Sequence, residues 1–155
     1  SFIKAKLRET GGAFGGEMSG HLFFKERWYG FDDALYAAAR LCEVLSGDNR
    51  PPSTVFAEIP DTVNTPELRI EMNEGEHHAL IQELVANGNF SGGSVCNIDG
   101  VRVDFEDGFG LARASNTTPT VILRFEADTA SALERIQDLY RAQILALRPT
   151  LTLPF

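Results

Sequence analysis

The sequence predicts an α+β fold in which helices cover one antiparallel sheet. Two predicted strands at residues 95–98 and 101–105 flank Asp99-Gly100, a dipeptide typical of tight hairpin turns. Nearer the C-terminus, apolar side chains recur at helical spacing, which predicts a long helix with one buried face. The 155 residues, 43% of them hydrophobic, suffice for one full domain or for one domain plus part of another.

The first sixty residues contain few predicted elements. Residues 2–10 read as the end of a helix that Gly11-Gly12 stops, and residues 13–16 as a short strand or tight crossing. A helix is expected at about 33–46, with Asp32 as its N-cap and Gly47 at its end. Its apolar stripe is Leu35, Ala38, Leu41, Cys42 and Leu45. After a proline-containing loop at 47–53, a short helix is expected at 54–59.

From about Asp61 the pattern changes to the alternation of half-buried strands. Leu68, Ile70 and Met72 alternate with charged residues, and residues 75–85 then read as a helix. Its inward-facing residues are expected to be Ala79, Leu80, Leu84 and Val85. The further predicted strands are 95–98, 101–105, 109–114 and 120–126, with a loop at 115–119. Asp128 or Thr129 is expected to cap a last helix that reaches Leu147 and buries Leu133, Ile136, Tyr140, Ile144 and Leu147.

The two parts of the chain differ in completeness. Residues 61–155 have enough strands and helices to close a small core, whereas residues 1–60 offer two or three elements with little partner surface. The first residue is Ser1 rather than Met. We therefore expect the chain to begin inside a domain of a longer protein.

Composition and charge exclude several classes of protein. The formal net charge is −8, so a broad nucleic-acid surface is not expected, although a local basic pocket for one small anion is compatible with it. No apolar run is long enough to cross a bilayer and no secretion signal is recognisable, so we expect a cytoplasmic protein without a membrane partner. Cys42 and Cys96 are too few for a disulfide framework or a zinc site, and we expect both to be buried free thiols.

The strongest local motif is RASNTTP at residues 113–119, where the chain leaves one strand and turns into the next. Arg113 is a forked cation that fits two phosphate oxygens, Ser115, Thr117 and Thr118 add hydroxyl donors, and Asn116 adds an amide. A turn can also present backbone N–H groups to an anion. The motif therefore indicates a site for a phosphate monoester. The alternative is a polar hairpin tip whose arginine pairs with a nearby acid.

A second motif is GEMSGH at residues 16–21. The Glu17 carboxylate and the Ser19 hydroxyl could hold neighbouring hydroxyl groups of a sugar, and His21 could transfer a proton near neutral pH. The alternative is a surface turn in which the serine caps a helix.

Other polar groups favour structural roles. His77 and His78 are adjacent, so on a helix they point in different directions, and we expect both to face solvent. The acids Asp99, Asp104, Glu106 and Asp107 lack calcium-loop spacing and are expected to form a solvated face. Trp28 and Tyr29 are expected to pack against the helix that follows them, although stacking on a base or sugar stays an alternative.

The two motifs, together with FKERW at residues 24–28, resemble the bacterial phosphomannomutase/phosphoglucomutase family of α-D-phosphohexomutases. The resemblance covers essentially the whole chain, including its Pro154-Phe155 end. Members have four domains around one cleft. The resemblance assigns residues 1–60 to the C-terminal part of domain 3, with the sugar-binding loop. It assigns residues 61–155 to domain 4, which has a TATA-box-binding-protein-like fold and carries the phosphate-binding loop.

The resemblance also implies roles for single residues. Glu17 and Ser19 match positions that hold the 3- and 4-hydroxyls of the hexose, and His21 matches a cleft histidine that assists proton transfer. Arg113, Ser115, Asn116 and Thr117, with Thr118 as a further candidate, match the loop that binds the phosphate not being transferred. The implied reaction interconverts 1- and 6-phosphates of glucose or mannose. It proceeds through a phosphoserine and a bisphosphorylated sugar.

The same resemblance implies what this chain lacks. The phosphoserine segment and the aspartate-rich Mg²⁺ loop belong to earlier domains, so we expect no metal bound to this chain and no mutase activity without those domains. The expected partners are hexose phosphates and the N-terminal domains of the same enzyme. Two other classes stay open: a non-enzymatic sugar-phosphate-binding module, and a metal-dependent hydrolase that uses Glu17, His21 and the His77-His78 pair.

Overall fold

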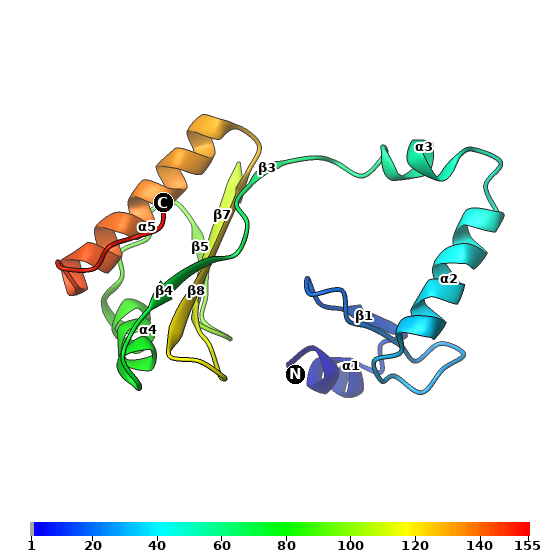
Figure 1. The fold of residues 1–155 in the computed structure, drawn as a ribbon, viewed down its shortest axis with the longest axis horizontal. Coiled ribbons are helices and arrows are strands. Elements are labelled where there is room, and N and C mark those ends of the chain that lie inside the picture. The colour runs from blue at the N-terminus through cyan, green and yellow to red at the C-terminus, as the bar shows by residue number, and fades with distance from the viewer. Residues whose placement is uncertain (1) are drawn as a thin grey trace. The chain divides into compact units, whose positions relative to one another are not determined.

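The computed structural model describes residues 2–155, which form two compact units that meet in sequence between Pro60 and Asp61. Each unit has its own elements (Figure 1). None of the helices in residues 2–155 is long and apolar enough to cross a membrane.

The first unit is a two-stranded antiparallel hairpin with three helices. Strand β1 pairs with β2 in a register that places Phe14 opposite Phe24 and Gly16 opposite Leu22. Helix α1 packs against β1 and helix α2 against β2. Phe23 and Leu7 are the buried apolar side chains among residues 2–60. The elements are α1 (Phe2–Thr10), β1 (Phe14–Gly16), β2 (Leu22–Phe24), α2 (Ala34–Ser46) and α3 (Pro52–Phe56).

Helix α2 corrects three expectations. Its N-cap is Asp33, whose carboxylate accepts the backbone N–H of Tyr36, while Asp32 instead pairs with Lys4 at 2.8 Å. None of its residues is buried, and Leu35 is 85% exposed. Cys42, on the same helix, is an exposed free thiol rather than a buried one. The apolar stripe is therefore present, but residues 2–60 provide no surface to cover it.

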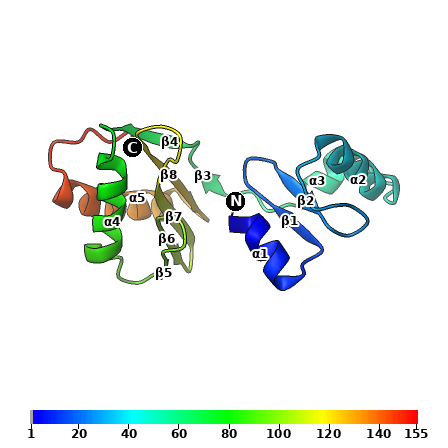
Figure 2. The ribbon, with the colours of Figure 1, turned by 90° about the horizontal axis from the view of Figure 1, so that it is seen from below.

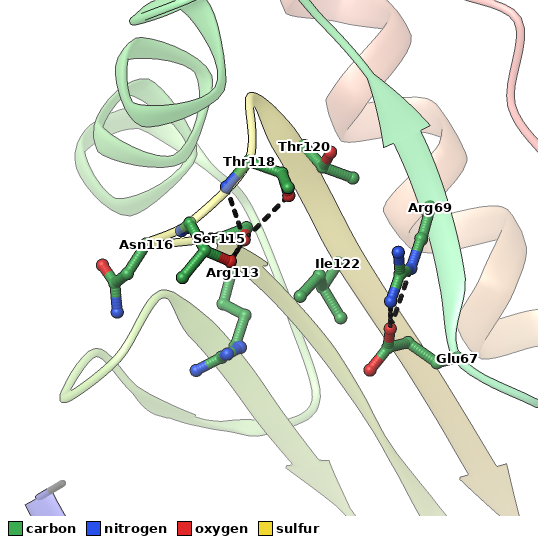
Figure 3. Close-up of a pocket in the computed structure, with 9 residues that line it drawn as sticks. Glu67, Arg69, Arg113, Ser115, Asn116, Thr118, Thr120 and Ile122 are labelled. Carbon is green, nitrogen blue, oxygen red and sulfur yellow. Dashed lines mark hydrogen bonds and ion pairs between the residues drawn. The ribbon is translucent and has the colours of Figure 1, made fainter.

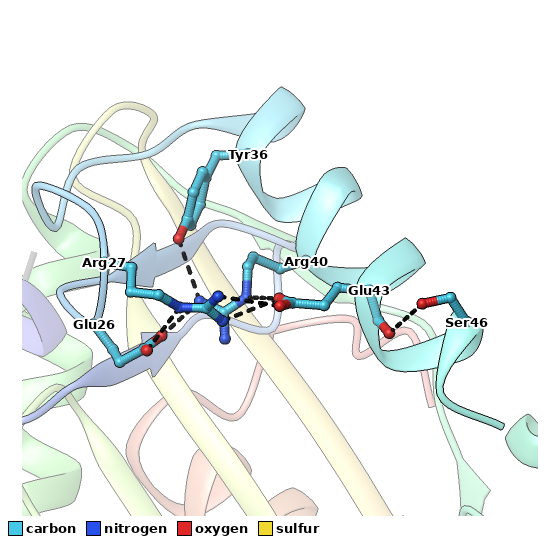
Figure 4. Close-up of polar contacts among 6 residues, drawn as sticks. All are labelled: Glu26, Arg27, Tyr36, Arg40, Glu43 and Ser46. Atoms are coloured by element: carbon cyan, nitrogen blue, oxygen red, sulfur yellow. Dashed lines mark hydrogen bonds and ion pairs between the residues drawn. The ribbon is translucent and has the colours of Figure 1, made fainter.

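The segment that follows β2 is fastened to α2 by charged and aromatic contacts. Trp28 stacks on Tyr36, with ring centroids 4.3 Å apart, which confirms that it packs on the following helix, whereas Tyr29, expected to do the same, is 78% exposed. Arg27, in a left-handed conformation with φ 59°, donates two bonds of 3.0 Å to the Glu43 carboxylate. Arg40 donates to Glu26 at 2.6 Å and closes a ring of alternating charges (Figure 4). These bonds hold the pKa of both carboxyl groups below its ordinary value: the main donor is Arg40 for Glu26 and Arg27 for Glu43.

The second unit is a six-stranded antiparallel sheet with two helices. The strand order is β3-β8-β7-β6-β5, and β4 pairs with β8 as well. This confirms the predicted α+β class. The elements are β3 (Val63–Asn64), β4 (Leu68–Glu71), α4 (Glu76–Asn87), β5 (Ser94–Cys96), β6 (Val101–Phe105), β7 (Gly108–Ala114), β8 (Thr120–Ala127) and α5 (Ala130–Leu147).

Helices α4 and α5 pack on the same face of this sheet, as both views show (Figures 1 and 2). Strand β8 sends Val121, Leu123 and Phe125 into the core between sheet and helices, and α5 sends Ile136, Tyr140 and Ile144, each at most 1% exposed. The Tyr140 hydroxyl donates toward backbone carbonyls of Val101 and Gly110, at 3.1 and 2.8 Å, and burial raises the pKa of this phenol. Thr129 is the N-cap of α5, and it is one of the two residues predicted for this position.

Three expectations for this unit are wrong. His77 is buried at 2% exposure and packs against His78, with ring centroids 4.1 Å apart, whereas His78 is exposed as expected. On the same helix Val85 is 42% exposed, and Ile81 is buried instead. The buried face of α4 is therefore rotated slightly about the helix axis relative to the face that the sequence predicts. Cys96 is a half-buried free thiol rather than a buried one.

Candidate functional site

In the first unit, Glu17, Ser19 and His21 lie together at the tip of the β1–β2 hairpin. The turn is closed by the Glu17 N–H, which donates to the His21 carbonyl at 2.8 Å, and by the Gly20 N–H, which donates to the Glu17 carbonyl at 2.9 Å. Gly20 adopts φ 83°, a left-handed conformation that glycine tolerates without strain. The serine lies in a surface turn, as the alternative expected, but this turn joins two strands and the serine caps no helix.

The three side chains of this turn are linked by hydrogen bonds. The Ser19 hydroxyl lies 2.7 Å from Nδ1 of His21 and 3.4 Å from Oε2 of Glu17. One arrangement satisfies both contacts: Nδ1–H of His21 donates to the hydroxyl, and the hydroxyl donates to the carboxylate. In neutral His21 this leaves Nε2 as a proton acceptor, and it leaves the second carboxylate oxygen of Glu17 for a ligand. The serine and histidine are exposed and the glutamate is half-buried.

In the second unit, the loop between β7 and β8 carries the five residues of the predicted phosphate site. Together they line a cavity of about 340 Å³ (Figure 3). The other lining residues are Glu67, Arg69, Thr120 and Ile122. The structure thus brings the predicted residues of this loop to one cavity: Arg113, Ser115, Asn116, Thr117 and Thr118.

Ser115 organises this loop from inside. It is 6% exposed, and its hydroxyl oxygen accepts the backbone N–H groups of Thr117 and Thr118, both at 3.3 Å, and the Thr118 hydroxyl at 3.0 Å. These N–H groups are therefore engaged, whereas the sequence led us to expect them to face an anion. The side chains of Asn116, Thr117 and Thr118 are left exposed. The donors offered at the loop surface are hence mainly side-chain groups.

Arg113 reaches the cavity from the end of β7. Its Nη1 donates to Oδ2 of Asp99 at 2.7 Å, so the acid of the predicted hairpin is its partner. That hairpin packs tightly on the arginine: a Cβ on Gly100, which has φ 91°, would lie 2.8 Å from the Arg113 Cα. The pair with Asp99 is the feature expected of the polar-hairpin alternative. It uses one N–H of a guanidinium that has five, so the pairing is compatible with anion binding as well.

Other polar groups do not form a metal site among the residues that the structure describes. Nowhere in residues 2–155 do three or more His, Cys, Asp or Glu side chains gather where they could hold an ion. The acids near the predicted hairpin are paired with arginines: Asp104 with Arg102 at 2.6 Å, and Asp107 with Arg135 at 2.5 Å. His77 and His78 lie on α4 of the second unit, whereas Glu17 and His21 belong to the first.

Two charged lining residues were missed by sequence reasoning. Glu67 and Arg69 lie just before and on β4, and Arg69 stands opposite Ile122 of β8. The alternation of Leu68, Ile70 and Met72 already placed Arg69 on the outer face of a strand. Alternation does not show which strand lies beside β4. Without knowing that this neighbour is β8, the sequence could not assign Arg69 to the cavity.

Comparison with known proteins gives consistent matches. Residues 1–63 match the family described as "Phosphoglucomutase/phosphomannomutase, alpha/beta/alpha domain III", and residues 67–143 match "Phosphoglucomutase/phosphomannomutase, C-terminal domain". A phosphomannomutase/phosphoglucomutase of Pseudomonas aeruginosa is 50% identical over all of this chain and 34% of its own length. A phosphoglucomutase of Neisseria gonorrhoeae is 56% identical over 93% of this chain and 32% of its own length.

A solved structure agrees with these matches. The crystal structure of a phosphoglucomutase/phosphomannomutase family protein from Burkholderia thailandensis has a TM-score of 0.90 and 52% identity. The match covers 99% of this chain and 32% of that one. The chain therefore spans about a third of the length of the relatives it matches.

Proposed function

The chain belongs to the phosphoglucomutase/phosphomannomutase family, and we propose that it supplies the substrate-binding part of a phosphohexomutase. The proposed reaction interconverts hexose 1-phosphate and hexose 6-phosphate of glucose or mannose, through a phosphoserine and a bisphosphorylated sugar. The observation that carries the proposal is the cavity lined by residues 113–118, where an arginine and several hydroxyl donors meet. We assign phosphate binding to the second unit and sugar binding to the first.

Phosphate binding rests on the donors at the surface of the β7–β8 loop. A phosphate monoester carries between one and two negative charges at neutral pH and three acceptor oxygens. Arg113 offers charge and a fork of N–H groups, and Asn116, Thr117 and Thr118 offer exposed neutral donors. In the proposal Ser115 supports the loop from inside as well as lining the cavity, because its oxygen already accepts three donors. A loop fixed in this way can bind phosphate with little ordering cost.

Sugar binding rests on the turn at the tip of the β1–β2 hairpin. The Glu17 carboxylate accepts hydrogen bonds from neighbouring hydroxyl groups, and we assign it and Ser19 to the 3- and 4-hydroxyls of the hexose. His21 is oriented by its 2.7 Å contact with Ser19, so that Nε2 can accept or return a proton of a reacting hydroxyl. Contacts restricted to the 3- and 4-positions would accept both glucose and mannose, which differ at the 2-hydroxyl.

The transfer chemistry itself is assigned outside this chain. Enzymes of the family use Mg²⁺, which stabilises the charge of a transferring phosphoryl group. Residues 2–155 do not fit such a site, because they contain no group of three or more ligands placed to hold an ion. We therefore derive no step through the metal, and we propose that the chain alone binds the substrate without converting it.

NMR titration of the ¹⁵N-labelled chain tests this proposal. Glucose 6-phosphate should shift the amides of residues 113–118, whereas glucose at the same concentration should leave them unchanged, because the loop recognises the charged phosphate. The same sample should not convert glucose 1-phosphate to glucose 6-phosphate. Equal shifts with both ligands would contradict the phosphate assignment, and turnover by the purified chain would contradict the assignment of chemistry to another part of the enzyme.

A further inference from the structure

The phosphate cavity has a second wall that does not belong to the β7–β8 loop. Strand β4 and the residue before it contribute Arg69 and Glu67 to the lining, across the cavity from Arg113 (Figure 3). Nothing in the loop motif predicts this wall. It brings a second guanidinium to the same cavity.

Strand register explains why the two arginines share this cavity. Ile122 of β8 stands opposite Arg69 of β4 on one side and opposite Arg113 of β7 on the other. Directly opposed residues point to the same face of an antiparallel sheet. That face is opposite to the helices, because the neighbours Val121 and Leu123 enter the core. The two arginine backbones are two strand spacings apart, about 10 Å, and the long side chains rise on either side of Ile122.

Arg69 is available for a ligand. Its side chain is 60% exposed, and its ion pair with Glu67 uses Nε at 2.9 Å and Nη2 at 2.7 Å. Both bonds end on one carboxylate oxygen, Oε1, so three of the five N–H groups of the guanidinium lie outside this pair. The pair fixes the direction of the side chain and leaves one edge of the fork open. Arg113 is held in a similar way by Asp99, through one bond of 2.7 Å.

We propose that Arg69 is a second cationic contact for the bound phosphate, facing Arg113 across Ile122, and that Glu67 positions it. The inference rests on the proposed function and extends its phosphate site by one residue. Two guanidinium groups, each already held by an acid, suit the two charges of a phosphate monoester dianion better than one does. Arg69 thereby adds affinity for the dianion, and we expect binding to strengthen as the pH rises through the second ionisation of phosphate, near pH 6.

The test compares two arginine variants that remove equal charge from the same sheet face. Arg102 stands opposite Leu111, two residues before Arg113 on β7, and it pairs with Asp104 two residues along its own strand. It does not line the cavity. The dissociation constants of inorganic phosphate and glucose 6-phosphate are measured by NMR for the whole chain. We expect Arg69→Gln to raise both about fivefold to tenfold, and Arg102→Gln to change them less than twofold.

The outcomes separate this inference from the proposed function. Equal weakening by Arg69→Gln and Arg102→Gln would show only a general charge effect and would overturn a contact by Arg69. Unchanged affinity in Arg69→Gln, with loss of binding in Arg113→Gln, would overturn the inference and leave the proposed function standing. If the unaltered chain bound neither ligand, both would fall. Arg69→Lys, which keeps the charge but loses the fork, should lie between the unaltered chain and Arg69→Gln.

Discussion

The two candidate ligand loops are both short turns between antiparallel strands, but the structure holds them in different ways. The loop at 113–118 joins two strands of a six-stranded sheet, and Ser115 beneath it is 6% exposed. The turn at 17–21 closes a two-stranded hairpin, and its side chains are fastened mainly to one another. The first loop therefore takes its shape from a closed core, whereas the second depends on local hydrogen bonds and on a small supporting unit.

The largest expected effect concerns the unit that supports the turn at 17–21. Phe23 is fully buried on β2, and Leu7 is the other buried apolar side chain among residues 2–60. Phe23→Ala removes contacts that typically contribute about 3–5 kcal/mol to the free energy of unfolding, which we expect to exceed the stability of so small a unit. The first unit should unfold, with a change in the fluorescence of Trp28, while the amides of the second-unit sheet keep their hydrogen-exchange protection.

A matched control for this experiment is available on helix α2. Leu35 is 85% exposed, so Leu35→Ala should change the free energy of unfolding by about 0.5 kcal/mol or less. If Phe23→Ala left the Trp28 signal and the chemical-shift dispersion of residues 2–60 intact, the prediction would be wrong. Contacts other than the burial of Phe23 and Leu7 would then stabilise the first unit.

The next effect compares the two loop serines directly. Ser115→Ala leaves the partly buried N–H groups of Thr117 and Thr118 without their acceptor, at an expected cost of about 1–3 kcal/mol in the stability of the second unit. Ser19→Ala removes an exposed hydroxyl and should cost about 0.5 kcal/mol or less. Denaturant unfolding, followed by amide exchange in each unit, measures both. Similar losses for the two serines would remove the distinction between a core-supported and a locally supported loop.

The smallest expected effect is a loss of stability, at acid pH, of the segment that follows β2. Hydrogen bonds from Arg40 and Arg27 lower the pKa of Glu26 and Glu43 in the folded chain, so their contribution to stability is present above the ordinary glutamate pKa. It is lost as the pH falls from the ordinary glutamate pKa through the lowered pKa of the folded chain. Because both carboxyl groups are exposed, we expect only local loosening around Trp28. The second unit has one such glutamate, Glu83, which is bonded to Arg148.

The acid prediction is checked by following both units in one titration. Carboxyl ¹³C shifts report the ionisation of each glutamate, and Trp28 fluorescence reports the segment after β2. A Trp28 signal that stayed constant while Glu26 and Glu43 became protonated would show that the ring of charges does not hold this segment in place.

The sequence was a good guide where local signals decide the structure. The Asp99-Gly100 hairpin, the inward row of Val121, Leu123 and Phe125, and the Thr129 cap depend on neighbouring residues and were expected. Predictions failed where a partner surface decides. The stripe of α2 is exposed because nothing among residues 2–60 covers it, and His77 is buried because the actual packing face of α4 includes it.

The candidate site shows the same division. The residue types at 17–21 and 113–118 predict both loops as ligand sites, because carboxylate, hydroxyl and guanidinium groups at close spacing suit sugar and phosphate groups. Arg69 was missed because its place beside Ile122 depends on which strands are neighbours. The internal role of Ser115 was also missed, since it depends on how the loop folds back over its own hydroxyl. Both properties arise from tertiary structure and leave no mark on residue spacing.

The central claim is that the loop at 113–118 binds the phosphate of a hexose phosphate through Arg113, and one titration tests it most directly. The dissociation constant of glucose 6-phosphate is measured by NMR for the unaltered chain and for Arg113→Gln, with spectra of both confirming that the second unit is folded. We expect the unaltered chain to bind through amides 113–118 and the variant to lose at least about tenfold in affinity. Equal affinity of the two proteins, with both folded, would contradict the claim.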